Sequence, residues 1–235
     1  MNRSSRQETY QVILLLSATL LCLGLAAYLR FVTNTNVYNY LAWDFFLAWV
    51  PVILSGTIKF MYRRLAAASI SKLATGVVFI AWVFFLPNSA YLFTEILHTF
   101  RYFDPQPPSI KFWFDPVFWY SLSVTFTAAV IGLLLSALSL YQVHSLIVRF
   151  IARVYSGAAI VCIVLLSSIG VYIGRFIRWN SWDVLNKPLA IMKDLLAESS
   201  RADSLMPEFV LLMFGIQLFS YVFYCVLRTG ESANA

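Results

Sequence analysis

The stretch "GVYIGRFIRWNSWDVL", residues 170–185, decides which kind of fold this chain adopts. It closes an apolar run over residues 157–177, and about 20 such residues are enough to cross a bilayer as a helix. Where that run leaves the membrane, the sequence places Arg175, Arg178 and Asp183 among tryptophans. Tryptophans are typical of the membrane–water interface. The charged residues in the same stretch require a separate explanation.

The composition indicates that this chain folds in lipid. Of its 235 residues, 60% are hydrophobic and 12% are charged, with a mean hydropathy of +0.76, whereas a soluble domain carries about 25% charged residues. The sequence therefore predicts an all-α, polytopic membrane protein with a single transmembrane domain over residues 1–235. Apolar runs of membrane length predict six transmembrane helices, at residues 11–29, 41–60, 73–93, 117–140, 157–177 and 207–227.

The basic residues indicate the orientation of these spans. With both termini on the cytoplasmic side, the cytoplasmic segments carry nine Lys and Arg residues but only Glu8 and Glu231 as acids. Because short cytoplasmic loops are enriched in Lys and Arg, we predict cytoplasmic N and C termini. The basic face would meet anionic headgroups of the lipid bilayer, and so apolar a chain is not expected to bind nucleic acid. The nine residues are Arg3, Arg6, Lys59, Arg63, Arg64, Lys72, Arg149, Arg153 and Arg228.

This orientation brings charged residues from three spans to the extracytoplasmic side. Asp44 lies near the outer end of the second span, and Glu95 follows the third span. Arg175, Arg178 and Asp183 end or follow the fifth span at the same level. Because a charge within the membrane requires a partner, these five residues are candidates either for an anion-binding site or for a structural ion pair.

A polar stripe continues the third span. Asn88, Tyr91, Glu95 and His98 fall within an arc of roughly 80° on an α-helix, and such a stripe should face protein or water rather than lipid. Glu95 and His98 are candidates for a catalytic acid and base. Hydrogen bonds that merely join neighbouring helices explain the stripe equally well. Pro87, directly before the stripe, leaves one backbone carbonyl without its helical partner and permits a kink in the helix.

The spacing Glu95-x-x-His98 is also compatible with two metal ligands on one helical face. The second histidine of the H-E-x-x-H motif is absent, and His144 is predicted to lie on the cytoplasmic side. We therefore predict no metal and no other cofactor.

Two glycines precede the first arginine of the opening stretch. The spacing Gly170-x-x-x-Gly174 in an apolar helix predicts close packing against a neighbouring helix. Arg175 follows directly, so it is either an interface anchor or a partner for Glu95 or Asp44 inside the bundle.

The last outer loop contains an amphipathic segment over residues 188–198. Its apolar residues fall on one side of a helix and its charged residues elsewhere, which predicts a short helix that lies on the outer surface as a lid. The residues predicted for the apolar side are Leu189, Met192, Leu195 and Leu196.

Three blocks carry a resemblance to a known family. "LAWDFFLAWVP" (residues 41–51), "FLPNSAYLFTEILH" (residues 85–98) and the opening stretch resemble the bacterial membrane proteins grouped as domain of unknown function 1361. The resemblance implies an uncharacterised integral protein of the bacterial cytoplasmic (inner) membrane, and it implies no activity. The family's usual form of the first block has asparagine where this chain has Asp44, which argues against a catalytic role for that carboxylate.

Three functions fit these features, and whether the chain is an enzyme stays open. We favour an accessory or assembly protein of the cell envelope, whose polar layer joins the helices or docks an envelope protein. The first alternative is an enzyme or binding site for an anionic lipid headgroup or another anionic envelope substrate, with Arg175 and Arg178 holding a phosphate. The second alternative is a small-solute transporter, although the inner halves of the spans are mostly apolar and no inverted repeat is visible.

Overall fold

The described part of the computed structural model is all-helical and contains six helices of membrane length, which confirms the predicted fold class. The structure describes residues 3–65, 69–101, 111, 114–179, 181–201 and 203–233, and no strand occurs among them. Each long helix overlaps one predicted span. The helices that are long and apolar enough to cross a membrane are Arg6–Thr33, Leu41–Arg63, Lys72–Phe100, Pro116–Ile147, Arg153–Ile177 and Met206–Arg228.

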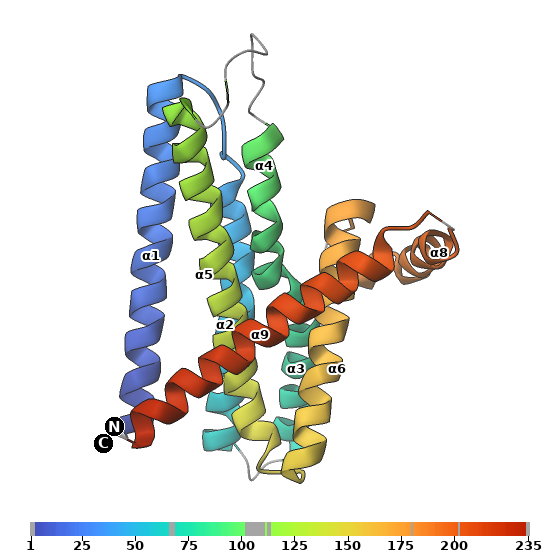
Figure 1. The fold of residues 1–235 in the computed structure, drawn as a ribbon. Coiled ribbons are helices and arrows are strands. Elements are labelled where there is room, and N and C mark those ends of the chain that lie inside the picture. Colours follow the sequence, from blue (N-terminus) through green and yellow to red (C-terminus); the bar gives the residue numbers. More distant parts are fainter. Residues whose placement is uncertain are drawn as a thin grey trace.

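Short helical turns extend two of the spans. A 3₁₀ turn, η1 (Leu92–Glu95), joins α3 to α4, and a π-helical turn, η3 (Ile173–Ile177), continues α6. Figure 1 shows the N and C termini at the same end of the bundle, as an even number of spans requires. The α-helices are α1 (Arg3–Thr33), α2 (Leu41–Leu65), α3 (Ser69–Tyr91), α4 (Ile96–Arg101), α5 (Pro116–Ile147), α6 (Arg153–Tyr172), α7 (Asp183–Asn186), α8 (Pro188–Ser199) and α9 (Met206–Ala233).

Helix α5 is the central helix of the bundle. It packs against α1, α2, α3 and α9, and its buried fraction is the largest of the six spans. Trp82 Nε1 of α3 donates a hydrogen bond of 2.6 Å to Ser139 Oγ of α5, which donates one of 3.0 Å to the carbonyl of Pro51 in α2. Because lipid offers no alternative hydrogen-bond partner, such contacts join the three helices.

A partly buried ion cluster joins α1, α2 and α9 at the end that holds the termini. Glu8 forms ion pairs with Lys59 and, at 3.2 Å, with Arg228 Nη2. The Arg228 guanidinium also lies 4.4 Å from the centre of the Tyr141 ring. Both basic residues are therefore neutralised within the bundle rather than left in lipid.

Helices α3 and α6 approach each other closely at Pro87. A Cβ atom on Gly170 would lie 2.5 Å from Pro87 Cγ, and one on Gly174 would lie 3.6 Å from the Tyr91 ring. The glycine spacing in the fifth span thus marks a packed face, as the sequence predicted. One turn beyond Pro87, the α-helix tightens into η1.

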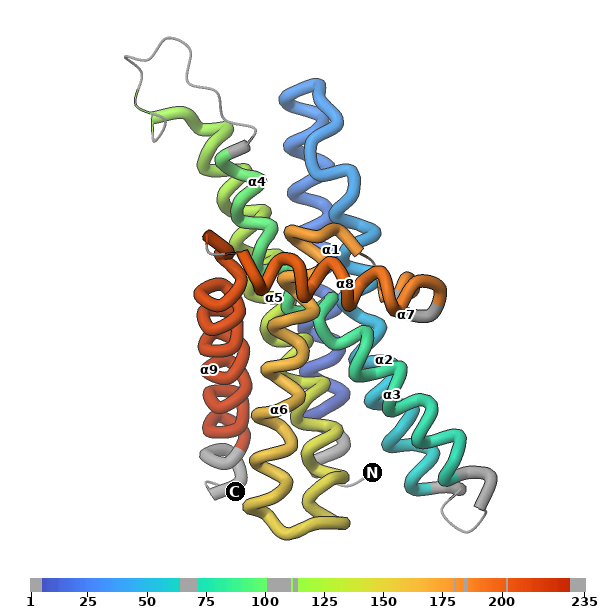
Figure 2. The backbone as a smooth tube through the Cα atoms, turned by 90° about the vertical axis from the view of Figure 1, so that its right-hand side faces the viewer, coloured from blue at the N-terminus to red at the C-terminus, as the bar shows by residue number. Residues whose placement is uncertain are grey.

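The predicted surface helix is α8, which lies across the ends of α6 and α9 (Figure 2). Two hydrogen bonds of 2.9 Å attach it to the end of the fifth span. Tyr172 Oη donates to Glu198 Oε1, and Trp179 Nε1 donates to Asp194 Oδ2. The helix therefore has a defined position relative to α6.

The apolar residues of α8 divide between the protein and its surroundings. Ile191 is buried against the bundle, whereas Leu189, Met192 and Leu196 are exposed. Because an amphipathic helix at a membrane surface places its apolar face against acyl chains, the exposed leucines fit contact with lipid. The residue that packs inward, Ile191, was not among those predicted for the apolar face.

Candidate functional site

Glu95 is the centre of a charge cluster at the end of the third span. Its side chain is 1% exposed, and Oε2 lies 2.8 Å from His98 Nδ1. On its other side, Oε1 lies 3.5 Å from Arg175 Nη1. Arg175 Nη1 also donates a 3.4 Å hydrogen bond to Tyr91 Oη. Because a buried carboxylate in the membrane is costly without partners, these contacts stabilise the junction between η1 and η3.

The π-helical turn gives the two arginines different environments. It spans Ile173–Ile177 and ends at Arg178, whose φ of 66° lies in the left-handed region. A π turn contains an additional residue compared with an α turn, and within it Arg175 faces Glu95. Arg178 is exposed instead, and no ion pair to it is found among the described residues.

Asp44 lies near this cluster but outside its ion pairs. It is close enough to interact electrostatically with Glu95, His98 and Arg175. Within the described part of the chain, no hydrogen bond or ion pair reaches its partly buried carboxylate. Asp183 begins α7 and is not a partner of Glu95 in that same part. The fold thus brings Tyr91, Glu95, His98 and Arg175 together. Asp44 and Asp183 take no part in the ion pairs of Glu95.

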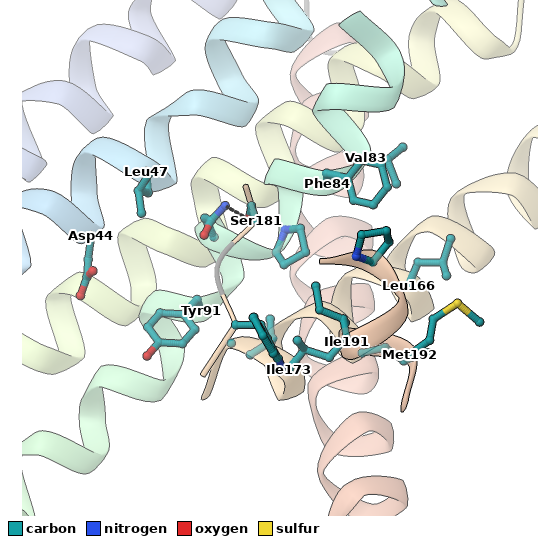
Figure 3. A pocket seen from close by; sticks show the side chains of 18 of the residues that line it. Asp44, Leu47, Val83, Phe84, Tyr91, Leu166, Ile173, Ser181, Ile191 and Met192 are labelled. Atoms are coloured by element: carbon teal, nitrogen blue, oxygen red, sulfur yellow. Dashed lines mark hydrogen bonds between the residues drawn. The ribbon is translucent and has the colours of Figure 1, made fainter. Parts of the chain in front are cut away.

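A cavity of about 560 Å³ lies between α2, α3 and α6 and is covered by α8. Figure 3 shows Asp44 and Tyr91 towards one side of it and Leu166 and Met192 towards the other. Its apolar lining comes from all four helices, and its polar lining comes from few residues. The lining residues are Trp43, Asp44, Leu47, Val83, Phe84, Pro87, Asn88, Tyr91, Leu166, Ile169, Gly170, Val171, Ile173, Gly174, Trp179, Ser181, Pro188, Ile191 and Met192.

Two polar groups of the cavity, Asp44 and Asn88, can accept hydrogen bonds from a ligand. Asp44 is the one charged residue that lines it among the described residues. Asn88 Nδ2 donates 3.0 Å hydrogen bonds to Ser181 Oγ and to the carbonyl of Phe85. Because that carbonyl can only accept, the amide nitrogen must face it. Asn88 Oδ1 is therefore the part of the amide that can accept a further bond.

The candidate acid and base do not reach this cavity. Glu95 and His98 are paired with each other, and neither is among the lining residues that the structure describes. The described residues also contain no group of three or more His, Cys, Asp or Glu side chains that could hold a metal ion. The geometry thus separates a closed ion cluster from an accessible cavity beside it.

A comparison with known families identifies the chain. The model for the family described as "Protein of unknown function (DUF1361)" matches residues 43–220. The chain belongs to this family. The matched region contains every residue of the cavity and all four residues of the Glu95 cluster, whereas α1 precedes it. Neither the curated proteins nor the solved structures contain a match to the chain.

Sequence reasoning found the polar residues of this region but missed the cavity. Asn88, Tyr91 and Asp44 were candidates because a polar residue in an apolar span is conspicuous. Val83 and Ile191 resemble any other apolar residue of a span, so no local signal identifies them as cavity lining. The Asn88–Ser181 contact joins residues 93 positions apart, and no pattern within either segment predicts it.

Proposed function

We propose that this protein binds an amphipathic lipid molecule in the cavity between α2, α3, α6 and α8. The observation that carries the proposal is the lining: a mostly apolar cavity of about 560 Å³ has its one described charged residue, Asp44, and the polar Tyr91 together on one side. Cavities that bind small molecules usually measure about 300–1,000 Å³ and combine an apolar lining with a few polar groups. An amphiphile has the same division between an apolar part and a polar part.

The rim of the cavity supports entry from the membrane. Trp43, Phe84, Leu166 and Met192 line the cavity and are exposed on the surface of the protein. They belong to α2, α3, α6 and α8. Because the exposed apolar surface of a membrane protein contacts acyl chains, a lipid would pass from the bilayer to the cavity without crossing water.

Binding is better supported than catalysis. The side chains proposed as acid and base, Glu95 and His98, are held in the ion cluster, so a ligand in the cavity would meet Asp44, Asn88 and Tyr91 instead. A lipid-binding role agrees with an accessory or assembly protein of the cell envelope. In this role the Glu95 cluster holds the ends of α3 and α6 in place.

The location that we propose is the bacterial cytoplasmic membrane, with both termini in the cytoplasm. The last turns of α2 and α5 and the first turns of α3 and α6 lie at the same end as the termini (Figure 1). That end carries Arg63, Lys72, Arg149 and Arg153, as is typical of cytoplasmic segments. The charge cluster and α8 would then face the extracytoplasmic side.

Blocking the cavity tests the proposal. Val83→Trp would place an indole in the cavity, whereas Val77→Trp adds the same side chain to an exposed position on the same helix. Native mass spectrometry of the purified protein with added phospholipids counts the lipids that stay bound. We expect one lipid to be retained by the wild type and by Val77→Trp and lost from Val83→Trp. Equal retention by all three proteins would contradict a binding site in this cavity.

A further inference from the structure

The geometry points to a primary ammonium group as the polar part of the lipid that binds in the cavity. Asp44 would select this headgroup. The inference rests on the proposed lipid site. A cationic group differs from the anionic substrate that Arg175 and Arg178 suggested in the sequence. The reason is the distribution of charge: Arg175 is directed at Glu95 and Tyr91, while Asp44 is the one charged residue of the cavity lining that the structure describes.

The charges around the cavity would be better balanced by one more cation. Glu95 has both a guanidinium and an imidazole as partners, whereas no ion pair reaches Asp44 in the regions that the structure describes. Two acidic side chains, Glu95 and Asp44, thus lie near one arginine side chain, Arg175. A partly buried carboxylate gains most from a cation that reaches it within the low-dielectric region. A ligand ammonium would supply that charge, and a ligand phosphate would add to the negative charge.

The hydrogen-bond acceptors of Asp44 and Asn88 also favour an ammonium. The carboxylate oxygens of Asp44 accept hydrogen bonds. The amide N–H groups of Asn88 already donate to the Phe85 carbonyl and to Ser181 Oγ. The acceptor that Asn88 retains, Oδ1, and the Asp44 carboxylate can both bind a donor. A primary ammonium has three N–H donors, whereas a trimethylated ammonium has none.

Basic residues at the covered end of the cavity fit the remainder of such a headgroup. Lys187 Nζ lies 5.7 Å from the centre of the Trp179 ring, and Trp179 lines the cavity. Arg178 is adjacent in sequence and exposed. A headgroup phosphate at this part of the rim would therefore meet cations.

The experiment compares three phospholipids with identical acyl chains by native mass spectrometry. Phosphatidylethanolamine carries a primary ammonium, phosphatidylcholine a trimethylated one, and phosphatidylglycerol none. We expect the wild type to bind phosphatidylethanolamine about tenfold more tightly than the other two, the effect of one charge-assisted hydrogen bond. This comparison uses the wild type alone and does not depend on whether a variant folds.

Variants then assign the preference to one side chain. Asp44→Asn should bind the three lipids equally, and Glu208→Gln, which removes the same charge from an exposed site outside the described lining, should keep the wild-type preference. Equal affinities for phosphatidylethanolamine and phosphatidylcholine in the wild type, or an unchanged preference in Asp44→Asn, would overturn the inference. Both results leave the proposed function standing if Val83→Trp still abolishes binding. If Val83→Trp bound every lipid as the wild type does, both the proposed function and this inference would be overturned.

Discussion

Arg175 Nη1 lies 3.5 Å from Glu95 Oε1, and this pair links the end of the fifth span to the 3₁₀ turn that follows the third. The carboxylate is almost completely buried, and His98 Nδ1 lies 2.8 Å from its other oxygen. The arginine therefore acts within the bundle, while Arg178, one turn later, is exposed. Two arginines of one short stretch thus have different environments.

Removing Arg175 should destabilise the protein strongly. Arg175→Ala leaves the Glu95 carboxylate without its guanidinium, and breaking a buried ion pair costs about 3–5 kcal/mol. The free energy of unfolding, measured by SDS titration in mixed micelles, reports the loss. Arg178→Ala is the matched control and should have little effect, because its side chain is exposed. A wild-type value for Arg175→Ala would show that Arg175 is only an anchor at the interface.

The same measurement on Glu95→Gln tests whether the two residues act as a pair. The double variant, Arg175→Ala with Glu95→Gln, should lose less free energy of unfolding than the two single variants lose in sum. The reason is that either substitution alone already removes the interaction. Strict additivity would mean that Arg175 stabilises the bundle through other contacts.

Adding one methyl group at Gly170 should disturb the crossing of α3 and α6. The Cβ atom of Gly170→Ala would lie 2.5 Å from Pro87 Cγ, and such overpacking typically costs about 1–3 kcal/mol. We expect a lower unfolding temperature in detergent. Gly157→Ala is the control on the same helix, where a Cβ atom meets nothing within 4 Å. Because alanine favours helix more than glycine does, the control should match or exceed the wild type. A Gly170→Ala protein as stable as this control would contradict the close packing.

The orientation of the chain can be tested by labelling single cysteines in intact cells. In a variant whose Cys22, Cys162 and Cys225 are replaced by serine, Ser200→Cys should react with a membrane-impermeant maleimide, because the exposed loop after α8 is proposed to face outward. Arg153→Cys, exposed at the opposite end, should react only after permeabilisation. The reverse pattern would invert the topology and move the cavity to the cytoplasmic side. Gln106, another suitable position by sequence, lies outside the described residues.

Much of the architecture follows from the sequence, because lipid imposes a simple constraint. A bilayer of known thickness requires apolar helices of a minimum length, so the runs that end near Leu29 and Ile177 predict spans without any knowledge of their packing. The helical period placed Tyr91 and Glu95 on one face. The glycine spacing before Arg175 identified the face on which α6 packs.

The tertiary structure decided which of these residues meet. Glu95 and Asp44 were equivalent candidates for Arg175 by sequence, and the separation of their helices determines that Glu95 receives the ion pair. The cavity arises because α6 approaches α3 at Gly170 while α8 returns across the end of the fifth span. These relations depend on how helices far apart in the chain cross one another. Local propensity and hydrophobic period describe each helix alone and contain no information on those crossings.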